Sequence, residues 1–268
     1  MATGRVILIT GAARGLGKAM ALRFAREPGV SLVLADKLKQ KGEVAAREAR
    51  TIGAKSVAFV ACDVARLQSA RELLCQVARR FGRLDVVIPN AGILKVGPVG
   101  EVEEKDLRAV FETNAIAAFR LLQAALPLLT KGRGPLRDEK DGGACVLFIS
   151  SVAALIGLKQ TALYSASKAA LLGLTRSAAV ELADCGVRVN ALCPSLCDTA
   201  MIRDELEYFS AQGGGRPSEI LEKFLAAQPI NRLIKPEEVA EVAWFLCSPS
   251  AAMITGQAIA LDGGLLAR

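Results

Sequence analysis

A phenol and an ammonium group stand four residues apart in this sequence, as Tyr164 and Lys168. Residues 164–183 have the apolar periodicity of a helix, so both side chains would lie on one face, one turn apart. An ammonium group beside a phenol favours the phenolate and would lower the pKa of Tyr164. The chain contains no histidine, so proton transfer near neutral pH has to use Asp, Glu, Lys, Cys or Tyr. Tyr164 is one of only two tyrosines and is our leading candidate for a general acid or base.

A glycine-rich turn lies between the first apolar run of the chain and a helical pattern. It reads Gly11-Ala12-Ala13-Arg14-Gly15-Leu16-Gly17. Glycines at a strand-to-helix turn let the backbone approach a pyrophosphate, and the helix N-terminus then supplies N–H groups and a partial positive charge. The position of the turn between a strand and a helix therefore predicts a dinucleotide site.

Asp36 ends the second apolar run. A carboxylate here can accept hydrogen bonds from both ribose hydroxyls of adenosine, and it repels a 2′-phosphate, so it favours NAD over NADP. The cations Arg14 and Lys37 favour the opposite choice, because they could hold that phosphate. We give the direct acidic contact more weight and predict NAD. The alternative role for Asp36 is to cap the N-terminus of the following helix.

The composition predicts a globular protein that binds neither nucleic acid nor membrane. The chain has 268 residues, of which 52% are hydrophobic, enough for a large core in a single domain over residues 1–268. The net charge of +7 is mildly basic, but only 4% of the residues are aromatic, and a nucleic-acid binder usually combines a basic stripe with aromatic residues. The longest apolar stretch, residues 144–158, is too short for a membrane span.

The seven cysteines are scattered and odd in number, and no C-x-x-C motif occurs. This pattern contains no disulfide framework and no thiolate metal site, so it predicts a reducing, cytoplasmic compartment and no metal. The missing histidine also excludes Ser-His-Asp and Cys-His catalysis and histidine-ligated zinc.

Short apolar runs alternate with helical patterns along the whole chain. The expected strands are 6–10, 31–35, 56–61, 84–88, 145–150, 187–192 and 258–261, and the expected helices lie near 16–26, 43–51, 66–81, 103–129, 164–183 and 236–247. Continuous apolar strands separated by helices indicate a mostly parallel sheet that is covered on both faces. We therefore predict an α/β fold, a single doubly wound, Rossmann-type domain with seven strands.

A variable segment, residues 195–230, interrupts this alternation. Its glycine-rich break at 212–217 would permit hinge motion near a site, so we predict a substrate lid. The candidate pocket residues come from this segment and from the loop after the fifth expected strand, and they are mostly apolar: Val152, Ala153, Leu155, Ile156, Leu158, Leu163, Met201, Ile202, Leu206, Tyr208 and Phe209.

Taken together, the motifs resemble the short-chain dehydrogenase/reductase family over essentially the whole chain. The matching features are Thr10-Gly-x-x-x-Gly-x-Gly17, Asp63-Val64, Asn90-Ala91-Gly92, Asn114, Ser151, Tyr164-x-x-x-Lys168, Asn190 to Pro194, Thr199 and Asp262-Gly263-Gly264. Each motif is weak evidence by itself, whereas the ordered set is highly specific.

The resemblance implies a catalytic tetrad of Asn114, Ser151, Tyr164 and Lys168. Tyr164 would act as general base in alcohol oxidation and as general acid in carbonyl reduction. Ser151 would hold the substrate oxygen together with Tyr164, and the adjacent Ser150 is its rival for this role. Asn114 would hold a water in a proton relay that passes through Lys168.

The same resemblance implies a set of cofactor-binding residues. They are Gly11, Arg14, Gly15, Leu16, Gly17, Asp36, Asp63, Val64, Asn90, Ala91, Gly92, Tyr164, Lys168, Pro194 and Thr199. Asp63 and Val64 would flank the adenine, residues 90–92 would lie along the adenosine ribose, and Thr199 would contact the carboxamide or a phosphate. Pro89 departs from the family pattern, and because proline lacks an N–H we expect a distortion at the end of the fourth strand.

We predict an NAD-dependent oxidoreductase that interconverts a small secondary alcohol and a ketone. One alternative is a 3-oxoacyl-thioester reductase that uses NADPH, and another is a catalytically silent protein that senses the cofactor. The resemblance also implies a homotetramer or homodimer built on the fourth and fifth helices, where residues 115–129 and 169–182 carry apolar faces.

Overall fold

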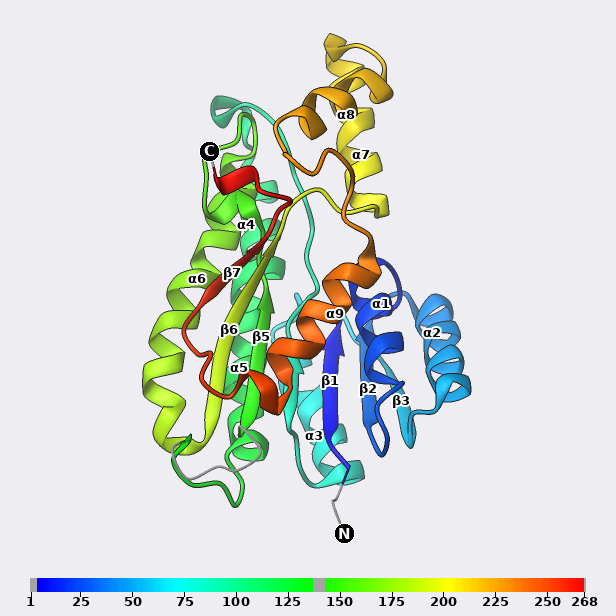
Figure 1. The fold of residues 1–268 in the computed structure, drawn as a ribbon, viewed down its shortest axis with the longest axis vertical. Helices are drawn as coiled ribbons and strands as arrows, with labels where there is room; N and C mark the ends of the chain where they lie inside the picture. Colours follow the sequence, from blue (N-terminus) through cyan, green and yellow to red (C-terminus); the bar gives the residue numbers. More distant parts are fainter. Residues whose placement is uncertain (1–3, 137–142, 268) are drawn as a thin grey trace.

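A parallel sheet organises the molecule. The computed structural model describes residues 4–136 and 143–267, and these residues form seven strands in the order β3-β2-β1-β4-β5-β6-β7 (Figure 1). The strands are β1 (Val6–Thr10), β2 (Ser31–Asp36), β3 (Ser56–Ala61), β4 (Val86–Ile88), β5 (Ala144–Ile149), β6 (Val187–Pro194) and β7 (Ala258–Leu261). Every neighbouring pair is parallel, and the chain order reverses between β1 and β4. Such a reversal opens a crevice at the carboxyl ends of the strands, and the predicted doubly wound α/β fold is confirmed.

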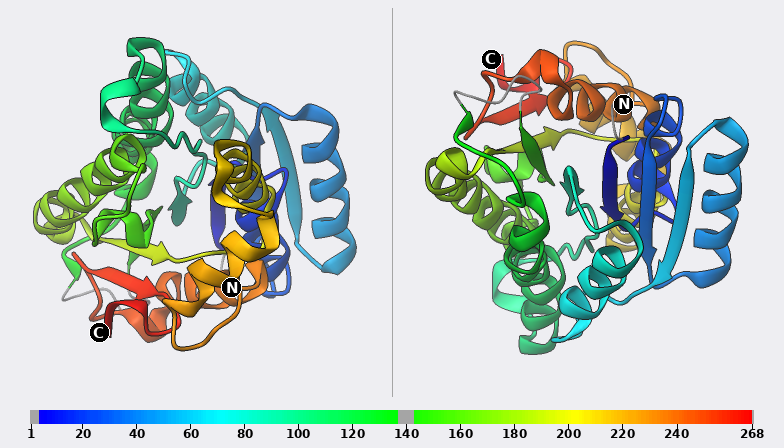
Figure 2. Two further views of the ribbon diagram at one scale, coloured as in Figure 1. Left: turned by 90° about the horizontal axis from the view of Figure 1, so that it is seen from above. Right: turned by 90° about the horizontal axis from the view of Figure 1, so that it is seen from below.

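Helices cover both faces of this sheet (Figure 2). They are α1 (Gly15–Phe24), α2 (Lys39–Ile52), α3 (Ser69–Phe81), α4 (Glu104–Phe111), α5 (Ala117–Leu129), α6 (Ala162–Leu182), α7 (Ala200–Phe209), α8 (Pro217–Ala226) and α9 (Pro236–Cys247). Side chains of β1 alternate between two cores: Ile7 and Ile9 pack with α1, α2 and α9, whereas Val6 and Leu8 pack with α3, α5 and α6. Among the described residues, no helix combines the length and the apolar character needed to cross a membrane.

The helix expected at 103–129 consists of three parts. Between α4 and α5 lies a π-helical turn, Glu112–Ile116, which contains the buried Asn114. A π turn adds one residue to a helical turn and often occurs at functional sites. Here it lets a polar side chain reach a neighbouring loop, an arrangement that a plain apolar periodicity does not reveal.

Strand β4 is shorter than expected. It begins two residues later than expected, at Val86, and ends at the expected residue, Ile88, directly before Pro89. Pro89 has no N–H to donate to the ladder, but its carbonyl still accepts a hydrogen bond from Ile149 N at 3.2 Å. The chain then leaves the sheet toward the carboxyl ends of the neighbouring strands.

The segment proposed as a lid forms α7, a π-helical turn (Ser210–Gly214) and α8. Both helices lie beyond the carboxyl ends of the strands (Figure 1). They share a small apolar cluster of their own, in which Ile202, Leu206 and Ile220 are buried. Because this cluster is separate from the two sheet cores, the segment is held to the domain by fewer buried contacts, as a mobile element requires.

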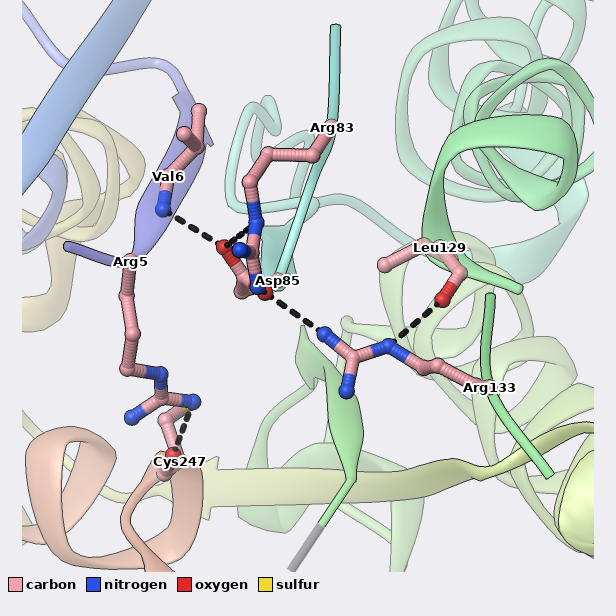
Figure 3. A network of polar contacts seen from close by, with 7 residues as sticks. All are labelled: Arg5, Val6, Arg83, Asp85, Leu129, Arg133 and Cys247. Carbon is pink, nitrogen blue, oxygen red and sulfur yellow. Dashed lines mark hydrogen bonds and ion pairs between the residues drawn. The ribbon is translucent and has the colours of Figure 1, made fainter. Parts of the chain in front are cut away.

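A network of charges closes the opposite end of the sheet (Figure 3). The buried carboxylate of Asp85 accepts hydrogen bonds from Val6 N at 2.8 Å, from Arg83 Nη2 at 2.6 Å and from Arg133 Nη2 at 2.6 Å. Arg133 Nε also donates to the carbonyl of Leu129 at 2.9 Å. One carboxylate thereby joins β1, the start of β4 and the end of α5.

Candidate active site

The glycine turn forms a tight cradle between β1 and α1. Gly11 and Gly15 have φ values of +65° and +54°, which side chains with a Cβ rarely adopt. A Cβ on Gly17 would overlap the Gly11 carbonyl oxygen. The N-cap residue of α1, Arg14, makes no side-chain capping bond, so the helix presents its N-terminal N–H groups, and these can bind an anion.

Thr10 and Asn90 fasten this cradle to the loop after β4. Thr10 Oγ1 accepts hydrogen bonds from Asn90 N at 3.1 Å and Ala91 N at 3.2 Å, while Asn90 Nδ2 donates to the carbonyls of Thr10 at 2.9 Å and Gly11 at 3.2 Å. Both amide hydrogens of Asn90 are therefore used within the protein. Residues 90–92 can therefore offer a ligand hydrogen-bond acceptors, namely backbone carbonyls and Asn90 Oδ1, rather than the Asn90 amide hydrogens.

Asp36 connects the end of β2 to the same cradle. Its Oδ2 accepts a hydrogen bond from Ala13 N at 2.9 Å, and its Oδ1 accepts one from Leu38 N, also at 2.9 Å. The N-cap position of α2 is Leu38, so Asp36 is not the N-cap residue that the alternative hypothesis required. Each carboxylate oxygen keeps a second lone pair for a ligand hydroxyl.

The remaining predicted cofactor residues lie at the carboxyl ends of their strands. Asp63 is exposed in the turn after β3, where its Oδ1 accepts a hydrogen bond from Ala65 N at 3.1 Å. Pro194 ends β6 and Thr199 is the N-cap residue of α7. The Thr199 methyl group lies 3.6 Å from the place where a Cβ on Gly15 would stand, so the start of α7 touches the glycine turn. Val64 and Leu16 are half-buried.

Lys168 is a buried ammonium group that donates one hydrogen bond within the described residues. Its Nζ donates to the carbonyl of Ile149 at 2.8 Å, and it lies 5.8 Å from the centre of the Tyr164 ring. Burial lowers the pKa of Lys168 to about 8. Gly92 packs against this group, because a Cβ there would stand 3.3 Å from both Lys168 Nζ and Asn114 Oδ1.

The Tyr164 side chain is half-buried and forms a hydrogen bond with the side chain of Ser151. Burial raises the pKa of Tyr164 well above its usual range, while the bond to Ser151 lowers it and the charge of Glu205 raises it further. The predicted net lowering of this pKa is therefore wrong for the polypeptide itself, because the desolvation of the phenolate outweighs the favourable contacts.

Ser150 and Ser151 have different roles in the structure. Ser150 is buried, and its Oγ donates to the carbonyl of Lys168 at 3.0 Å. Ser151 begins a short helical turn, where its Oγ accepts a hydrogen bond from Ala153 N at 3.2 Å and contacts Tyr164. Only Ser151 faces the phenol, which favours it over its rival.

Asn114 links the loop after β4 to α6. Its Oδ1 accepts a hydrogen bond from Ile93 N at 2.8 Å, and its Nδ2 donates to the carbonyl of Ile93 at 2.9 Å and to Ser167 Oγ at 3.0 Å. Ser167 in turn donates to the carbonyl of Tyr164 at 2.7 Å. The sequence analysis missed Ser167, although it lies three residues after Tyr164 on the same helix.

A cavity of about 310 Å³ lies beside these residues. Its lining consists of Arg14, residues 92–96, Met201, Asp204, Glu205 and Tyr208. Of the predicted pocket residues, Met201 and Tyr208 line this cavity, whereas Ile202 and Leu206 are buried in the cluster that α7 and α8 share. The acidic residues of α7 were not predicted. The signal was the helical spacing itself, because positions 201, 204, 205 and 208 share one face of a helix.

Fold and site together define a dinucleotide-binding α/β enzyme with a Tyr-Lys-Ser constellation. The family model described as Enoyl-(Acyl carrier protein) reductase matches residues 11–266. An uncharacterized oxidoreductase of Thermotoga maritima is 36% identical over 97% of each chain, and the cis-4-hydroxycyclohexanecarboxylate dehydrogenase of Sinomonas cyclohexanicum is 36% identical over 98% of this chain and 97% of its own. The chain belongs to the short-chain dehydrogenase/reductase family of oxidoreductases.

Solved structures agree with this assignment. Levodione reductase superimposes with a TM-score of 0.89 at 29% identity, covering 98% of each chain. The 3-ketoacyl-(acyl-carrier-protein) reductase of Brucella melitensis, solved as a complex with NADH, has a TM-score of 0.84 at 29% identity and covers 99% of each chain. The predicted family is therefore confirmed by both sequence and fold.

Proposed function

We propose that this protein is an NAD(H)-dependent oxidoreductase that interconverts a secondary alcohol and a ketone, with Tyr164 as general acid and base. The observation that carries the proposal is the meeting of Tyr164, Ser151 and Lys168 beside the glycine turn, at the carboxyl ends of β1, β4 and β5. Ligands of doubly wound sheets bind at this edge.

The glycine turn, Asp36 and the N-terminus of α1 fit a dinucleotide and would hold it. When bound, the nicotinamide exchanges a hydride with the carbinol carbon. The protein positions the substrate oxygen between two hydroxyl groups: Ser151 Oγ donates a hydrogen bond to that oxygen as negative charge develops, and Tyr164 Oη transfers a proton to it in the reducing direction. The raised pKa of Tyr164 keeps the phenol protonated, which suits this proton donation.

Lys168, whose Nζ lies 5.8 Å from the centre of the Tyr164 ring, supports the proton transfer. Its pKa of about 8 leaves the ammonium group the main form at neutral pH but able to give up a proton. Asn114 and Ser167 fix the loop and the helix on either side of it. We propose that the relay from Tyr164 to solvent passes through Lys168 and a water near Asn114.

The preference for NAD rests on Asp36. Its two bonds to the backbone of Ala13 and Leu38 hold the carboxylate at the end of β2, and a fixed anion there repels a 2′-phosphate. The whole proposal is tested by following nicotinamide absorbance with a panel of cyclic and open-chain ketones. NADH oxidation with at least one ketone, faster than NADPH oxidation, is the expected result, and cofactor binding without any turnover would favour a sensing role.

A 3-oxoacyl-thioester reductase is the second candidate. A specific observation favours it, namely the 0.84 TM-score to a 3-ketoacyl-(acyl-carrier-protein) reductase. Asp36 argues against the NADPH that this alternative assumes. Rapid NADPH-dependent reduction of a 3-oxoacyl thioester, with no reduction of simple ketones, would select this alternative.

We also propose a homotetramer or homodimer in the cytoplasm. The support is exposed apolar surface on α5 and α6: Phe119 on α5 is 53% exposed and Val180 on α6 is 82% exposed. Such exposed apolar groups are often covered by another subunit. Light scattering at micromolar concentration distinguishes an oligomer from a monomer, and the latter result would contradict the proposal.

A further inference from the structure

We propose that Glu205 binds a hydrogen-bond donor of the substrate, an ammonium or hydroxyl group, and that the cavity beside it rejects an anionic group at the same place. This inference rests on the proposed function, because it assigns a substrate class to the site of Tyr164. It is carried by the position of Glu205, by its lack of a protein partner and by the charges around it.

The position of Glu205 makes it part of the substrate cavity. It lines the 310 Å³ space together with residues 92–96, Met201 and Tyr208. Its charge acts on Tyr164, and Gly92 on the opposite wall stands beside Lys168 and Asn114. A molecule that places its carbonyl oxygen at Tyr164 therefore has its remaining atoms within reach of Glu205.

The Glu205 carboxylate has no hydrogen-bonded or ion-paired partner among residues 4–136 and 143–267. Two other carboxylates differ in this respect: Asp36 accepts two backbone N–H groups, and Glu238 pairs with Arg232. Glu205 is half-buried, and burial raises its pKa to about 7. A carboxylate in this condition gains free energy from any donor that enters the cavity.

The charges around Glu205 leave the cavity acidic. Lys95 is held by Asp106 at 3.0 Å, and Arg203 by Asp198 at 2.9 Å. Arg14 lies in the glycine turn, where the cofactor phosphates would neutralise it. Of the charged groups that line this space, Asp204 and Glu205 of α7 then remain without an ion-paired partner in the described part of the chain.

Several groups from neighbouring elements set the ionisation of Glu205. The titratable groups that face it are Tyr164 of α6, Asp204 and Tyr208 of its own helix α7, and Arg14 and Lys95 in the cavity lining. The desolvation of the carboxylate is the cause that dominates. An entering ammonium group stabilises the ionised form, so its binding strengthens as Glu205 loses its proton.

The test uses matched six-membered ketones that differ only at carbon 4, because the cavity volume suits a ring of this size. They are 4-aminocyclohexanone, 4-hydroxycyclohexanone, cyclohexanone and 4-oxocyclohexanecarboxylate. We expect kcat/KM to decrease in this order for the ammonium, hydroxyl, unsubstituted and carboxylate compounds. Reduction of 4-hydroxycyclohexanone with no advantage for 4-aminocyclohexanone would identify the hydroxyl as the donor.

Glu205→Gln is expected to lower kcat/KM for 4-aminocyclohexanone about tenfold or more, since bonds to a charged partner are the stronger ones. The ratio of this value to that for cyclohexanone measures the loss of the donor contact, because the effect of the Glu205 charge on Tyr164 is common to both ketones. Glu205→Lys should raise the value for 4-oxocyclohexanecarboxylate. The matched control is Glu207→Gln, at an exposed position of α7 outside the cavity lining. An unchanged order of the four ketones in Glu205→Gln, with Tm and NAD binding preserved, overturns the inference.

Binding without catalysis separates this inference from the proposed function. Cyclohexylamine carries the ammonium group but no reacting carbonyl, and calorimetry measures its affinity for the wild type and Glu205→Gln. We expect the wild type to bind cyclohexylamine more tightly at pH 8 than at pH 6, and Glu205→Gln to show no such difference. If no ketone is reduced while this difference persists, the proposed reaction is wrong and the donor site stands; reduction of ketones without the difference refutes the donor site alone.

Discussion

Buried charges lie at both ends of the central sheet, but those at the amino end have more hydrogen-bond partners than those at the carboxyl end. At the amino end, Asp85 accepts hydrogen bonds from β1, Arg83 and Arg133, and the fully buried Arg188 donates to three carbonyl groups. At the carboxyl end, Lys168 has a single backbone acceptor and Glu205 has no partner among the described residues.

The difference indicates what each end does. A buried charge whose hydrogen-bond partners are all present stabilises the fold, because removing any one partner leaves a buried charge uncompensated. A buried charge with few partners has a shifted pKa and can still form bonds with a ligand. The lowered pKa of Lys168 and the raised pKa of Glu205 support the candidate site at the carboxyl end.

The strongest test of this comparison is Tyr164→Phe. The ring and its packing remain, but the proton donor is lost, so kcat should fall about 10²–10⁴-fold. NAD binding and Tm should stay close to wild type. Fluorescence titration with NADH and steady-state kinetics measure the two properties, and a variant that keeps most of its kcat would remove Tyr164 from the mechanism.

Asp85→Ala tests the other end. Arg83, Arg133 and the N–H of Val6 lose their common acceptor, and we expect the free energy of unfolding to fall by about 3–5 kcal/mol. At a temperature where the variant is still folded, kcat/KM should change little. Urea unfolding monitored by circular dichroism gives the first value. A large loss of kcat in the folded variant would break the division between a structural and a functional end.

Asp36→Ala tests the choice of cofactor. Removal of the carboxylate should shift the ratio of kcat/KM for NADH over that for NADPH toward NADPH by about tenfold, through relief of the repulsion of a 2′-phosphate. A smaller loss of stability accompanies it, because Ala13 N and Leu38 N lose an acceptor. Equal ratios in the variant and the wild type would assign Asp36 a structural role only.

The smallest effect concerns the pH dependence of stability. The folded pKa of Glu205, about 7, lies above its unfolded value, so the native state binds the proton more tightly. The corresponding stabilisation is complete below about pH 4.5 and is lost as the pH rises through 7. Glu205→Gln should therefore become more stable than the wild type by about 1–2 kcal/mol on going from pH 5 to pH 8, and thermal melts at both values measure this.

Local signals predicted much of the architecture. Apolar runs located the strands within about two residues, and the end of β4 at Ile88 agrees with the expected one. The spacing of Tyr164 and Lys168 put both groups on one helix, where Lys168 lies 5.8 Å from the phenol ring centre. These features depend on residues close together in the chain, so the sequence pattern contains them.

Features that depend on distant partners were not predictable in this way. The bonds between Thr10 and Asn90, the donors around Asp85 and the π turn at Asn114 all join segments far apart in the chain. The net rise of the Tyr164 pKa follows from burial, which a helix pattern does not measure. Glu205 was missed because one acidic residue on an amphipathic helix is ordinarily a solvated one.

The extra residue in the Glu112–Ile116 turn determines which deletions and substitutions the protein tolerates there. Each residue of a helix advances the side chains by about 100°. Deleting the extra residue would restore regular winding and leave α5 in place, but it would remove the widened turn from which Asn114 reaches Ile93. We expect single-residue deletions in this turn to abolish activity, whereas most substitutions at its outward-facing positions should preserve it.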